Sequence, residues 1–559
     1  MDDVAAVGVL ECLGDLDAVA DGLRLRHPAA AFGQQVTQRE AMDVLHDEVG
    51  LALMAAGVVD RRDVWVLQPG DDARLAFEVA IRSGAAKELD ADPAAEAQVL
   101  GEPDFRHAAG TEQPFEAISC IYDIGSVQAV VILRAVGRGL VSRDRNAELL
   151  LLAFSAGFAL LAWRALDAAA TPLPATTGRI VLQFLVTALL GHLALRAVAP
   201  AASPLPYAAA MLLTAVGLAF VLRLAPEVAQ NQANWALLGV ILMAATAGAH
   251  RWLPLLRRYR YTAAAGALVL LLVTGFLGTT INGARLWISV GGQIVQTTEV
   301  IKLLVVVFLA GYLGETGAIL AVPRFRLGDR TYRALPYLIP LLLAVAGLMA
   351  VLALLKDLGS VALLVLLTLS ALYLATGRKL FIAGGLVLLL ATSVFGYYAF
   401  DHARTRIDVW LNPYDDPSGA GYQTIQSSYA VEAGGVTGAG LGLGQPEVIP
   451  AAATDYVFSA IAEELGMAGA AAVVLLYVLL LFAGLRVAME ARDLHLQLLA
   501  ALPACLLAIQ AAVIIAGNLR LIPTTGITLP FVSYGGSSLV VNFVLIGLVL
   551  AVSQRTRAA

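Results

Sequence analysis

Asp455 stands where a long polar stretch meets the start of an apolar run. A carboxylate at such a boundary loses part of its hydration, and desolvation raises its pKa toward the range in which a general base works. The same position also suits a helix N-cap, because the side chain of Thr454 or Asp455 can accept a hydrogen bond from a backbone N–H group in the first turn. The residue type therefore fits either a catalytic base or a cap.

Charged side chains also occur as pairs in apolar surroundings. Glu299 and Lys302 are three residues apart, so they share one face of a helix, where they could bind a substrate or simply neutralise each other. Lys356 and Asp357 form a second pair between two apolar runs. Because a charge in apolar surroundings is costly, each pair is a candidate for function.

A guanidinium and an indole, those of Arg285 and Trp287, precede the first pair. Arginine is well suited to phosphate, and tryptophan favours the boundary between apolar and polar phases. Near the other end of the chain, Pro523–Ser538 contains two prolines and paired glycines in an apolar region. Membrane proteins tolerate this pattern where backbone lines a cavity, so Ser533 and Ser537 are candidate substrate-binding hydroxyls.

The longest polar stretch runs from Phe400 to Glu463. It contains the candidate substrate-binding amides of Gln423 and Gln426, and it is dense in glycine from Gly434 to Gly444. Long structured loops concentrate function, although plain flexibility would also explain the glycines. Four charged residues near its start could form no more than a solvated face: Asp401, Arg404, Arg406 and Asp408.

These residues belong to an unusually apolar chain. Of its 559 residues, 59% are hydrophobic and 14% are charged, against about 45–50% and about 25% in globular proteins, and the mean hydropathy is +0.77. This composition excludes a soluble, a disordered and a collagen-like protein. Charge divides the chain, because residues 1–145 carry 25 acidic and 13 basic residues, whereas residues 146–559 carry 18 and 24.

Apolar runs long enough to cross about 30 Å of hydrocarbon follow one another from Ala147 onward. We expect twelve spans, at 147–165, 180–198, 206–224, 235–249, 262–279, 300–319, 335–355, 358–376, 380–399, 463–486, 494–517 and 529–552. Basic clusters at 251–260, 324–333, 378–379 and 555–557 then share one side, which the positive-inside rule makes the cytoplasm. The long loop at 400–462 lies outside. The stretch 147–165 could instead be the last helix of the N-terminal part.

The N-terminal part predicts a small cytosolic α/β domain. It lacks a secretory signal, and short strands are expected at 63–68, 75–79, 117–123 and 127–133, with a helix at 35–50. The last hairpin, followed by Ser142-Arg143-Asp144, resembles the end of a GAF domain. We therefore expect a GAF-like regulatory domain at 1–146, an extra transmembrane helix with its connector at 147–178, and a membrane domain at 179–555.

The membrane part resembles the SEDS family (shape, elongation, division and sporulation) of the RodA/FtsW type. The resemblance covers roughly residues 175–555 and rests on these motifs: Gly283–Ile288, Gln296–Lys302, Asp357–Gly359, Asn412-Pro413 with Gly421–Gln423, Thr454–Phe458 with Glu463–Gly466, and Pro523–Ser538. It implies a polytopic α-helical membrane protein of about 10–12 transmembrane helices, multi-pass in the bacterial cytoplasmic (inner) membrane. The implied enzyme is a peptidoglycan glycosyltransferase that polymerises lipid II at the outer face during cell elongation or division. The implied partner is a class B penicillin-binding protein, with no nucleic acid.

Carried to this sequence, the resemblance makes Asp455 the catalytic base. A sugar hydroxyl of the acceptor would lose its proton to Asp455 while it attacks the donor, and Lys302 and Arg285 would stabilise the departing diphosphate. The other substrate-binding residues that it implies are Trp287, Glu299, Asp357, Gln423, Gln426, Ser533 and Ser537. No cofactor is assigned, and a divalent cation, Mg²⁺ or Mn²⁺, is left open as an aid to the departing group.

The chain departs from the family pattern beside Asp455. The family usually has Leu-Pro-Glu, and a histidine just before Thr-Asp, where this chain has Ile449-Pro450 followed by Ala451–Ala453. Two alternative functions stay open, a lipid II flippase and an inactive scaffold of the cell-wall machinery. A flippase is expected to line a path at mid-membrane with ionisable residues, and apart from His192 the expected span centres carry almost none.

Overall fold

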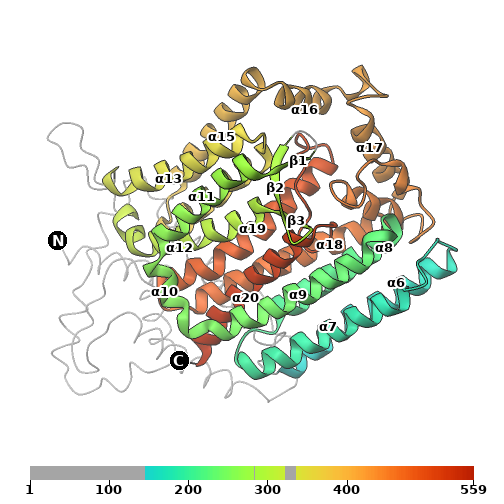
Figure 1. Ribbon diagram of the computed structural model, residues 1–559, viewed down its shortest axis with the longest axis horizontal. Coiled ribbons are helices and arrows are strands. Elements are labelled where there is room, and N and C mark those ends of the chain that lie inside the picture. The colour runs from blue at the N-terminus through green and yellow to red at the C-terminus, as the bar shows by residue number, and fades with distance from the viewer. Residues whose placement is uncertain (1–144, 282–283, 322–334, 559) are drawn as a thin grey trace, which may run out of the picture. The chain divides into compact units, whose positions relative to one another are not determined.

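The computed structural model describes residues 145–281, 284–321 and 335–558 (Figure 1). The predicted GAF-like domain, with its strands and helix, lies outside these residues except for its last two. Within the described parts, twelve helices are long and apolar enough to cross a membrane, the same number as the predicted spans. They are α6 Arg145–Ala168, α7 Thr177–Val198, α8 Leu205–Leu224, α9 Ala229–Gly248, α11 Arg260–Leu277, α12 Thr297–Ala321, α13 Leu335–Leu354, α14 Leu358–Thr376, α15 Lys379–Ala399, α18 Val457–Glu490, α19 Leu494–Asn518 and α20 Gly536–Ala558. The short helix α10, Leu253–Arg258, lies between α9 and α11.

Two helix boundaries beside the candidate site differ from the predicted spans. α18 begins at Val457, before the apolar run at 463, because its first turns are buried against other elements rather than exposed. α20 begins at Gly536 instead of 529, because Pro530 has no backbone N–H and Phe531 has a φ of 67°, in the left-handed region. Residues 519–535 therefore form an irregular segment, and the predicted break within this span is confirmed.

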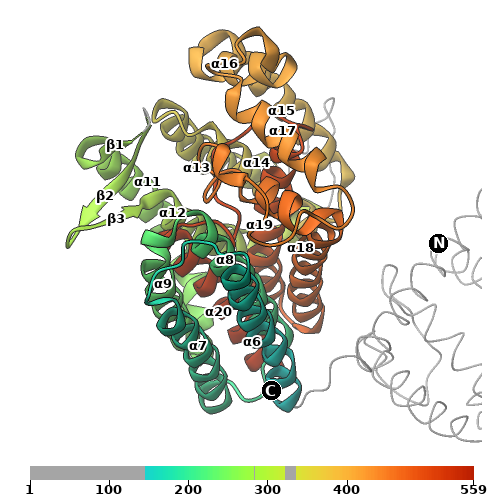
Figure 2. The same ribbon diagram turned by 90° about the vertical axis from the view of Figure 1, so that its right-hand side faces the viewer.

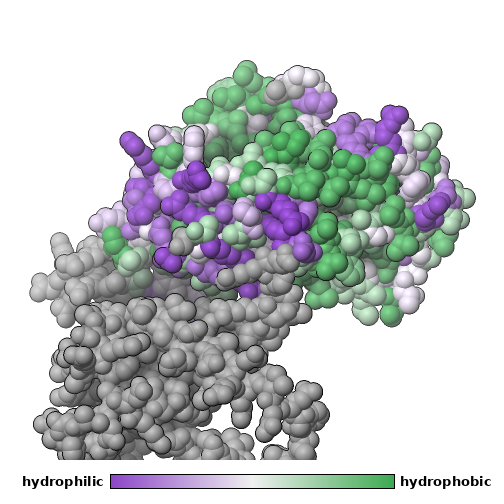
Figure 3. Space-filling model, turned by 90° about the horizontal axis from the view of Figure 1, so that it is seen from below, coloured by the Kyte–Doolittle hydropathy of each residue, from purple (hydrophilic) through white to green (hydrophobic). Residues whose placement is uncertain are grey.

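α8 is buried along nearly its whole length, and α6, α9, α18 and α20 pack against it. α20 lies along α9, and the two backbones approach closely because glycines stand at the contact. A Cβ atom on Gly239 would lie 2.6 Å from Cδ2 of Phe543, and one on Gly547 would lie 2.8 Å from the carbonyl oxygen of Met243. Peripheral helices such as α6 and α15 turn large apolar side chains outward, and Figure 3 shows a broad hydrophobic area over the described helices. Such a surface suits lipid.

Contacts between polar segments define two opposite ends of the bundle. At one end the backbone N–H of Ser203 donates to Oγ of Ser553 (2.9 Å), and Nη1 of Arg555 donates to the carbonyl oxygen of His250 (3.4 Å). We call this the basic end, since it holds these described basic residues: Arg251, Arg257, Arg258, Arg260, Arg555 and Arg557. The other end, the loop end, carries α16 Asp401–Leu411 and α17 Tyr422–Gly434, as Figure 2 shows.

The stretch between the spans expected at 262–279 and 300–319 forms a small antiparallel sheet at the loop end. Its strands are β1 Thr279–Ile281, β2 Ala284–Val290 and β3 Gln293–Gln296, in the order β1-β2-β3. Gly291 and Gly292 join β2 to β3 with φ values of 59° and 80°, the conformation that a two-residue hairpin turn requires. The sheet places Trp287 opposite Gln296, directly before α12 begins.

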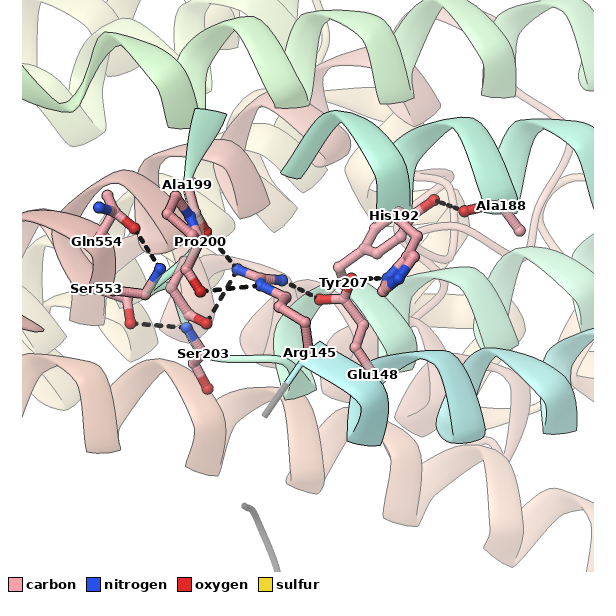
Figure 4. Close-up of polar contacts among 12 residues, drawn as sticks. Arg145, Glu148, Ala188, His192, Ala199, Pro200, Ser203, Tyr207, Ser553 and Gln554 are labelled. Atoms are coloured by element: carbon pink, nitrogen blue, oxygen red, sulfur yellow. Dashed lines mark hydrogen bonds and ion pairs between the residues drawn. The ribbon is translucent and has the colours of Figure 1, made fainter. Parts of the chain in front are cut away.

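A buried cluster of charges ties α6 to α7 and to the connector before α8 (Figure 4). Arg145 donates to Glu148, and Glu148 Oε1 lies 2.8 Å from Nδ1 of His192. Nη2 of Arg145 also donates to the carbonyl oxygens of Ala199 (2.6 Å) and Ala202 (3.0 Å). α6 also packs along α8, so it is one of the helices of the bundle.

Candidate active site

Asp455 lies in the turn Ala451–Tyr456, directly before α18. It lines a pocket of about 150 Å³ at the loop end. The pocket is lined by Thr405, Arg406, Val409, Ala420, Gln423, Thr424, Asp455, Tyr456, Ile514, Gly517, Asn518, Thr524, Thr525, Gly526 and Ile527. The N-cap position of α18 is Tyr456, and no side chain caps it, so the interpretation of Asp455 as a cap is wrong.

The surroundings of Asp455 act on its protonation in two directions. Burial raises the pKa of Asp455 above its ordinary range, whereas the hydroxyl of Thr454 and the positive charge of Arg406 lower it. Burial is the largest of these effects, so the pKa of the carboxyl is raised. A raised pKa makes the carboxylate a better proton acceptor than an exposed aspartate.

Asn518, the last residue of α19, holds the Asp455 turn in place. Its Nδ2 donates to the carbonyl oxygen of Asp455 (2.9 Å), and its Oδ1 accepts from the backbone N–H of Ser459 (3.3 Å). Its own carbonyl oxygen accepts from the Ser427 hydroxyl (3.2 Å). Asn518 was not among the predicted site residues, and its sequence position at the end of an apolar run gave no signal beyond the polar side chain itself.

Ser533, a predicted substrate-binding residue, also contacts this turn. Its hydroxyl donates to the carbonyl oxygen of Thr454 and accepts from the backbone N–H of Leu529 (2.9 Å). The backbone N–H of Tyr534 donates to the carbonyl oxygen of Ala453 (2.9 Å). The irregular segment 519–535 therefore holds the turn through hydrogen bonds outside the pocket. Ser533 is a positioning residue and does not line the pocket.

Helix α16 covers the pocket and is attached to the same irregular segment. Nη1 of Arg406 donates to the carbonyl oxygens of Thr524 (3.1 Å) and Thr525 (2.8 Å). Nε1 of Trp410 donates to the carbonyl oxygen of Arg520 (2.9 Å), and Nη2 of Arg520 donates back to the carbonyl oxygen of Trp410 (3.2 Å). The polar stretch expected as a loop thus contains a helix whose arginine is aimed at the pocket.

Gly526 separates the two charges of the pocket. With a φ of 70° it adopts a conformation that favours glycine, and a Cβ atom there would lie 3.2 Å from Nη2 of Arg406 and 3.8 Å from Oδ2 of Asp455. A side chain at this position would fill the space between the cation and the carboxylate. The interpretation of Arg406 as part of a solvated face is therefore incomplete, whereas Arg404 lies over the ring of Tyr397, outside the pocket lining.

The predicted pair Glu299 and Lys302 lies in α12, away from the pocket lining. The two side chains are buried and form an ion pair of 2.7 Å, so they neutralise each other. Nζ of Lys302 also donates to Oε1 of Gln510 (2.8 Å), whose Nε2 donates to the carbonyl oxygen of Thr528 (2.7 Å). The pair is therefore linked to the irregular segment 519–535 through Gln510.

Three other predicted residues also lie outside the pocket lining. Asp357 caps α14, where its carboxylate accepts from the backbone N–H (3.0 Å) and hydroxyl (2.6 Å) of Ser360, and burial raises its pKa. Arg285 is exposed on β2, and its Nη1 donates to the carbonyl oxygen of Gly275 (3.1 Å). Trp287 is half-buried on the same strand.

Of the remaining predicted residues, one lines the pocket and the others lie outside its lining. Gln423 of α17 lines the pocket with Asp455, and Gln426 lies on the same helix outside the lining. The Ser537 hydroxyl accepts from the backbone N–H of Gln296 (3.2 Å), which attaches α20 to the sheet. In the parts of the chain that the structure describes, three or more His, Cys, Asp or Glu side chains nowhere converge, and the pocket offers a single carboxylate, so the residues of the pocket do not fit a bound metal ion.

Glu463 and Glu464 organise the glycine-dense part of the long loop. Oε1 of Glu463 accepts from the backbone N–H of Gln445 (2.7 Å), and Oε2 of Glu464 accepts from that of Gly442 (3.0 Å). Oε1 of Glu464 accepts from Nε of Arg223 at the end of α8 (3.1 Å). The loop is therefore fixed to the helix that follows Asp455, and flexibility alone does not explain its glycines.

The sequence of the chain matches a known family of membrane proteins. A family model described as cell cycle protein, of FtsW, RodA and SpoVE, matches residues 205–558, from the start of α8 to the end of α20. The chain belongs to this FtsW/RodA/SpoVE family. Together with its apolar helices, this membership makes it a mostly helical, multi-pass membrane protein.

Relatives and solved structures extend the likeness. The peptidoglycan glycosyltransferase RodA of Mycobacterium tuberculosis is 37% identical over 430 residues, which cover 74% of this chain and 91% of the relative. A probable peptidoglycan glycosyltransferase FtsW of Geobacter metallireducens is 34% identical over 334 residues, 59% of this chain and 85% of the relative. A solved chain from work on structural coordination of polymerization and crosslinking by a peptidoglycan synthase complex aligns with a TM-score of 0.49 and 28% identity, covering 68% of this chain and 98% of that one.

Proposed function

We propose that the chain is a peptidoglycan glycosyltransferase that polymerises lipid II into glycan strands. The observation that carries the proposal is Asp455, a carboxylate with a raised pKa in a pocket at one end of the bundle. Relatives that are 34–37% identical bear the name of this enzyme, which supports the same activity here. The pocket adds the acid–base group that glycosyl transfer needs.

In the proposed reaction a sugar hydroxyl of the acceptor attacks the anomeric carbon of the donor. Its proton passes to a carboxylate oxygen of Asp455 as the new C–O bond forms. The bond between the anomeric carbon and the diphosphate breaks, and its electron pair leaves with undecaprenyl diphosphate. The partial burial of Asp455 favours the proton transfer, because it destabilises the charged carboxylate relative to the neutral acid.

We further propose that the pocket faces the outside of the bacterial cytoplasmic membrane. The argument is electrostatic, because arginines gather at the basic end, and the positive-inside rule assigns that end to the cytoplasm. Asp455 lies at the loop end, where lipid II would be used after its export.

The partners and the N-terminal part complete the proposal. A class B penicillin-binding protein would crosslink the strands that this enzyme makes, whether in elongation or in division. Residues 1–146 would act as a cytosolic, GAF-like regulatory domain, joined to the polymerase through α6. Their net acidic character, with 25 acidic and 13 basic residues up to position 145, contrasts with the basic membrane part.

The test is polymerisation of labelled lipid II by the purified full-length chain, together with the penicillin-binding protein that copurifies with it. Wild type should give glycan strands and Asp455→Asn should give none, because an amide cannot accept the proton. Asp408→Asn is the matched control, since Asp408 is exposed on α16 and bonds to the Tyr397 hydroxyl (3.1 Å) outside the pocket lining. A folded, partnered wild type that makes no strands would contradict the proposal, and lipid II flipping would then be measured in liposomes.

A further inference from the structure

The pocket holds one positive charge opposite its one carboxylate. Its titratable and charged lining residues are Arg406 from α16 and Asp455 and Tyr456 from the turn before α18. The walls from α17, α19 and the irregular segment contribute amides, hydroxyls, backbone and apolar groups. A substrate anion that enters this pocket therefore meets the guanidinium of Arg406.

The geometry of Arg406 prepares it for an anion. The carbonyl oxygens of Thr524 and Thr525 hold Nη1, while Nη2 lies nearest to the space over Gly526. The side chain is exposed, although backbone bonds fix its direction. A fixed guanidinium can form two parallel hydrogen bonds to phosphate oxygens without much further loss of side-chain freedom.

The cations expected to bind the diphosphate are placed elsewhere. Lys302 is buried against Glu299 and Gln510, and Arg285 is committed to the β1–β2 region and the carbonyl oxygen of Gly275. Both lie outside the pocket lining, so the departing diphosphate needs another partner beside Asp455.

We propose that Arg406 is a catalytic residue that binds the diphosphate of the lipid donor and stabilises the charge that develops on it as it departs; this rests on the proposed glycosyl transfer. Asp455 takes the proton on one side of Gly526, and Arg406 receives the leaving oxygen on the other. Because backbone bonds fix the guanidinium before the substrate binds, its charge is preorganised for the leaving oxygen. The same positive charge also favours the ionised form of Asp455 before the substrate binds.

Binding of the departing group tests the inference without turnover. The full-length chain in lipid nanodiscs is titrated with undecaprenyl diphosphate and, as a neutral reference, with undecaprenol. Arg406→Gln keeps a hydrogen-bond donor for the carbonyl oxygens of Thr524 and Thr525 and removes the charge. It should weaken undecaprenyl diphosphate binding about tenfold or more and leave undecaprenol unchanged, as expected for a charge-assisted hydrogen bond.

Matched variants separate a charge from a structural support. Arg404→Gln removes a cation from the same helix outside the pocket lining and should bind like wild type. Arg406→Lys should retain most of the affinity. In the pH–rate profile, the acid limb reports the protonation of Asp455. This limb should stay near that of wild type in Arg406→Lys and move to higher pH in Arg406→Gln, because the charge of Arg406 lowers the pKa of Asp455. The inference is overturned if Arg406→Gln binds undecaprenyl diphosphate as tightly as wild type. It is also overturned if Arg406→Gln polymerises lipid II faster than Arg406→Lys. In either case Arg406 only supports the backbone.

The outcomes distinguish this inference from the proposed function. In one outcome, wild type polymerises lipid II, Asp455→Asn does not, and Arg406→Gln matches wild type in rate, pH profile and lipid affinity. This outcome would support the proposed function and show that Arg406 has no part in it. In the other outcome, wild type makes no strands but binds undecaprenyl diphosphate through the charge of Arg406. This outcome would support the anion-binding site and contradict the proposed polymerase activity.

Discussion

Replacing Asn518 by alanine should disable the Asp455 turn without touching the carboxylate. The substitution removes the Nδ2 donor of the Asp455 carbonyl oxygen (2.9 Å) and the Oδ1 acceptor of the Ser459 backbone N–H (3.3 Å). Asn518 is only 5% exposed, so water cannot freely replace both bonds. Its backbone carbonyl, which accepts from Ser427, is unaffected.

The magnitude follows from these two bonds. The N–H of Ser459 loses its side-chain acceptor but keeps its bond to the carbonyl oxygen of Tyr456 (3.0 Å), so this loss costs only about 0.5–1 kcal/mol. The carbonyl oxygen of Asp455 lies at the pocket and loses a net bond of about 1 kcal/mol. We therefore expect Asn518→Ala to lower the free energy of unfolding by about 1–2 kcal/mol. A shift of about 1 Å in the position of Asp455 would reduce polymerisation on the order of a hundredfold.

The assay combines lipid II polymerisation with thermal unfolding of the purified chain. Asn518→Asp retains an acceptor for Ser459 but lacks the donor and adds a negative charge near Asp455, so it should unfold closer to wild type while its acid limb moves to higher pH. Ser428→Ala is a matched control, because its hydroxyl bonds within α17 (2.9 Å) and not to the turn. Wild-type polymerisation and unfolding in Asn518→Ala would refute this reasoning.

Three further predictions concern buried charge. Lys302→Met leaves Glu299 buried without its cation and should lower the free energy of unfolding by about 3–5 kcal/mol, part of which the double variant with Glu299→Leu should recover, both read from thermal unfolding. Asp455→Asn should raise the unfolding midpoint at neutral pH but not in acid. Because burial raises the folded-state pKa, stability is highest below the unfolded pKa, where both states bind the proton, and falls as the pH rises toward the folded pKa. Deleting residues 1–140 keeps Arg145 and should preserve polymerisation, whereas deleting residues 1–147 leaves Glu148 without Arg145 and should lower the unfolding midpoint.

The helices could be predicted because hydropathy reports directly on length and burial in lipid. The polar elements at the loop end could not. α16 buries only Ala403, so it has no apolar stripe to mark it as a helix, and it lies within the stretch expected as a loop. The sheet did carry a signal, because Gly291-Gly292 between short β-favouring runs is typical of a hairpin, although no strands were expected there.

The sequence drew attention to Asp455 by itself, but it gave no sign that Arg406 and Asn518 line the same pocket. Asp455 stood out because a carboxylate at an apolar boundary is costly wherever it lies. Arg406 and Asn518 reach the pocket from other helices, and only the packing of α16 and α19 against the irregular segment brings them there. Lys302 was expected near the diphosphate because the family resemblance implies that role, whereas its spacing from Glu299 indicates only that the two share a helix face and not what that face contacts.

The alanines beside Asp455 show how this chain builds its turn without the polar neighbours that its family usually has. Ala451 has a φ of 59°, and its carbonyl oxygen accepts from the backbone N–H groups of Thr454 (3.1 Å) and Asp455 (3.0 Å) and from the Thr454 hydroxyl (3.2 Å), so the turn closes on a backbone carbonyl. Ala453 accepts from the backbone N–H of Tyr534 (2.9 Å). The position of Asp455 is therefore fixed without those side chains, while its charge is balanced from α16. Substitutions at Ala453 should then alter the pH dependence of the reaction more than the placement of its base.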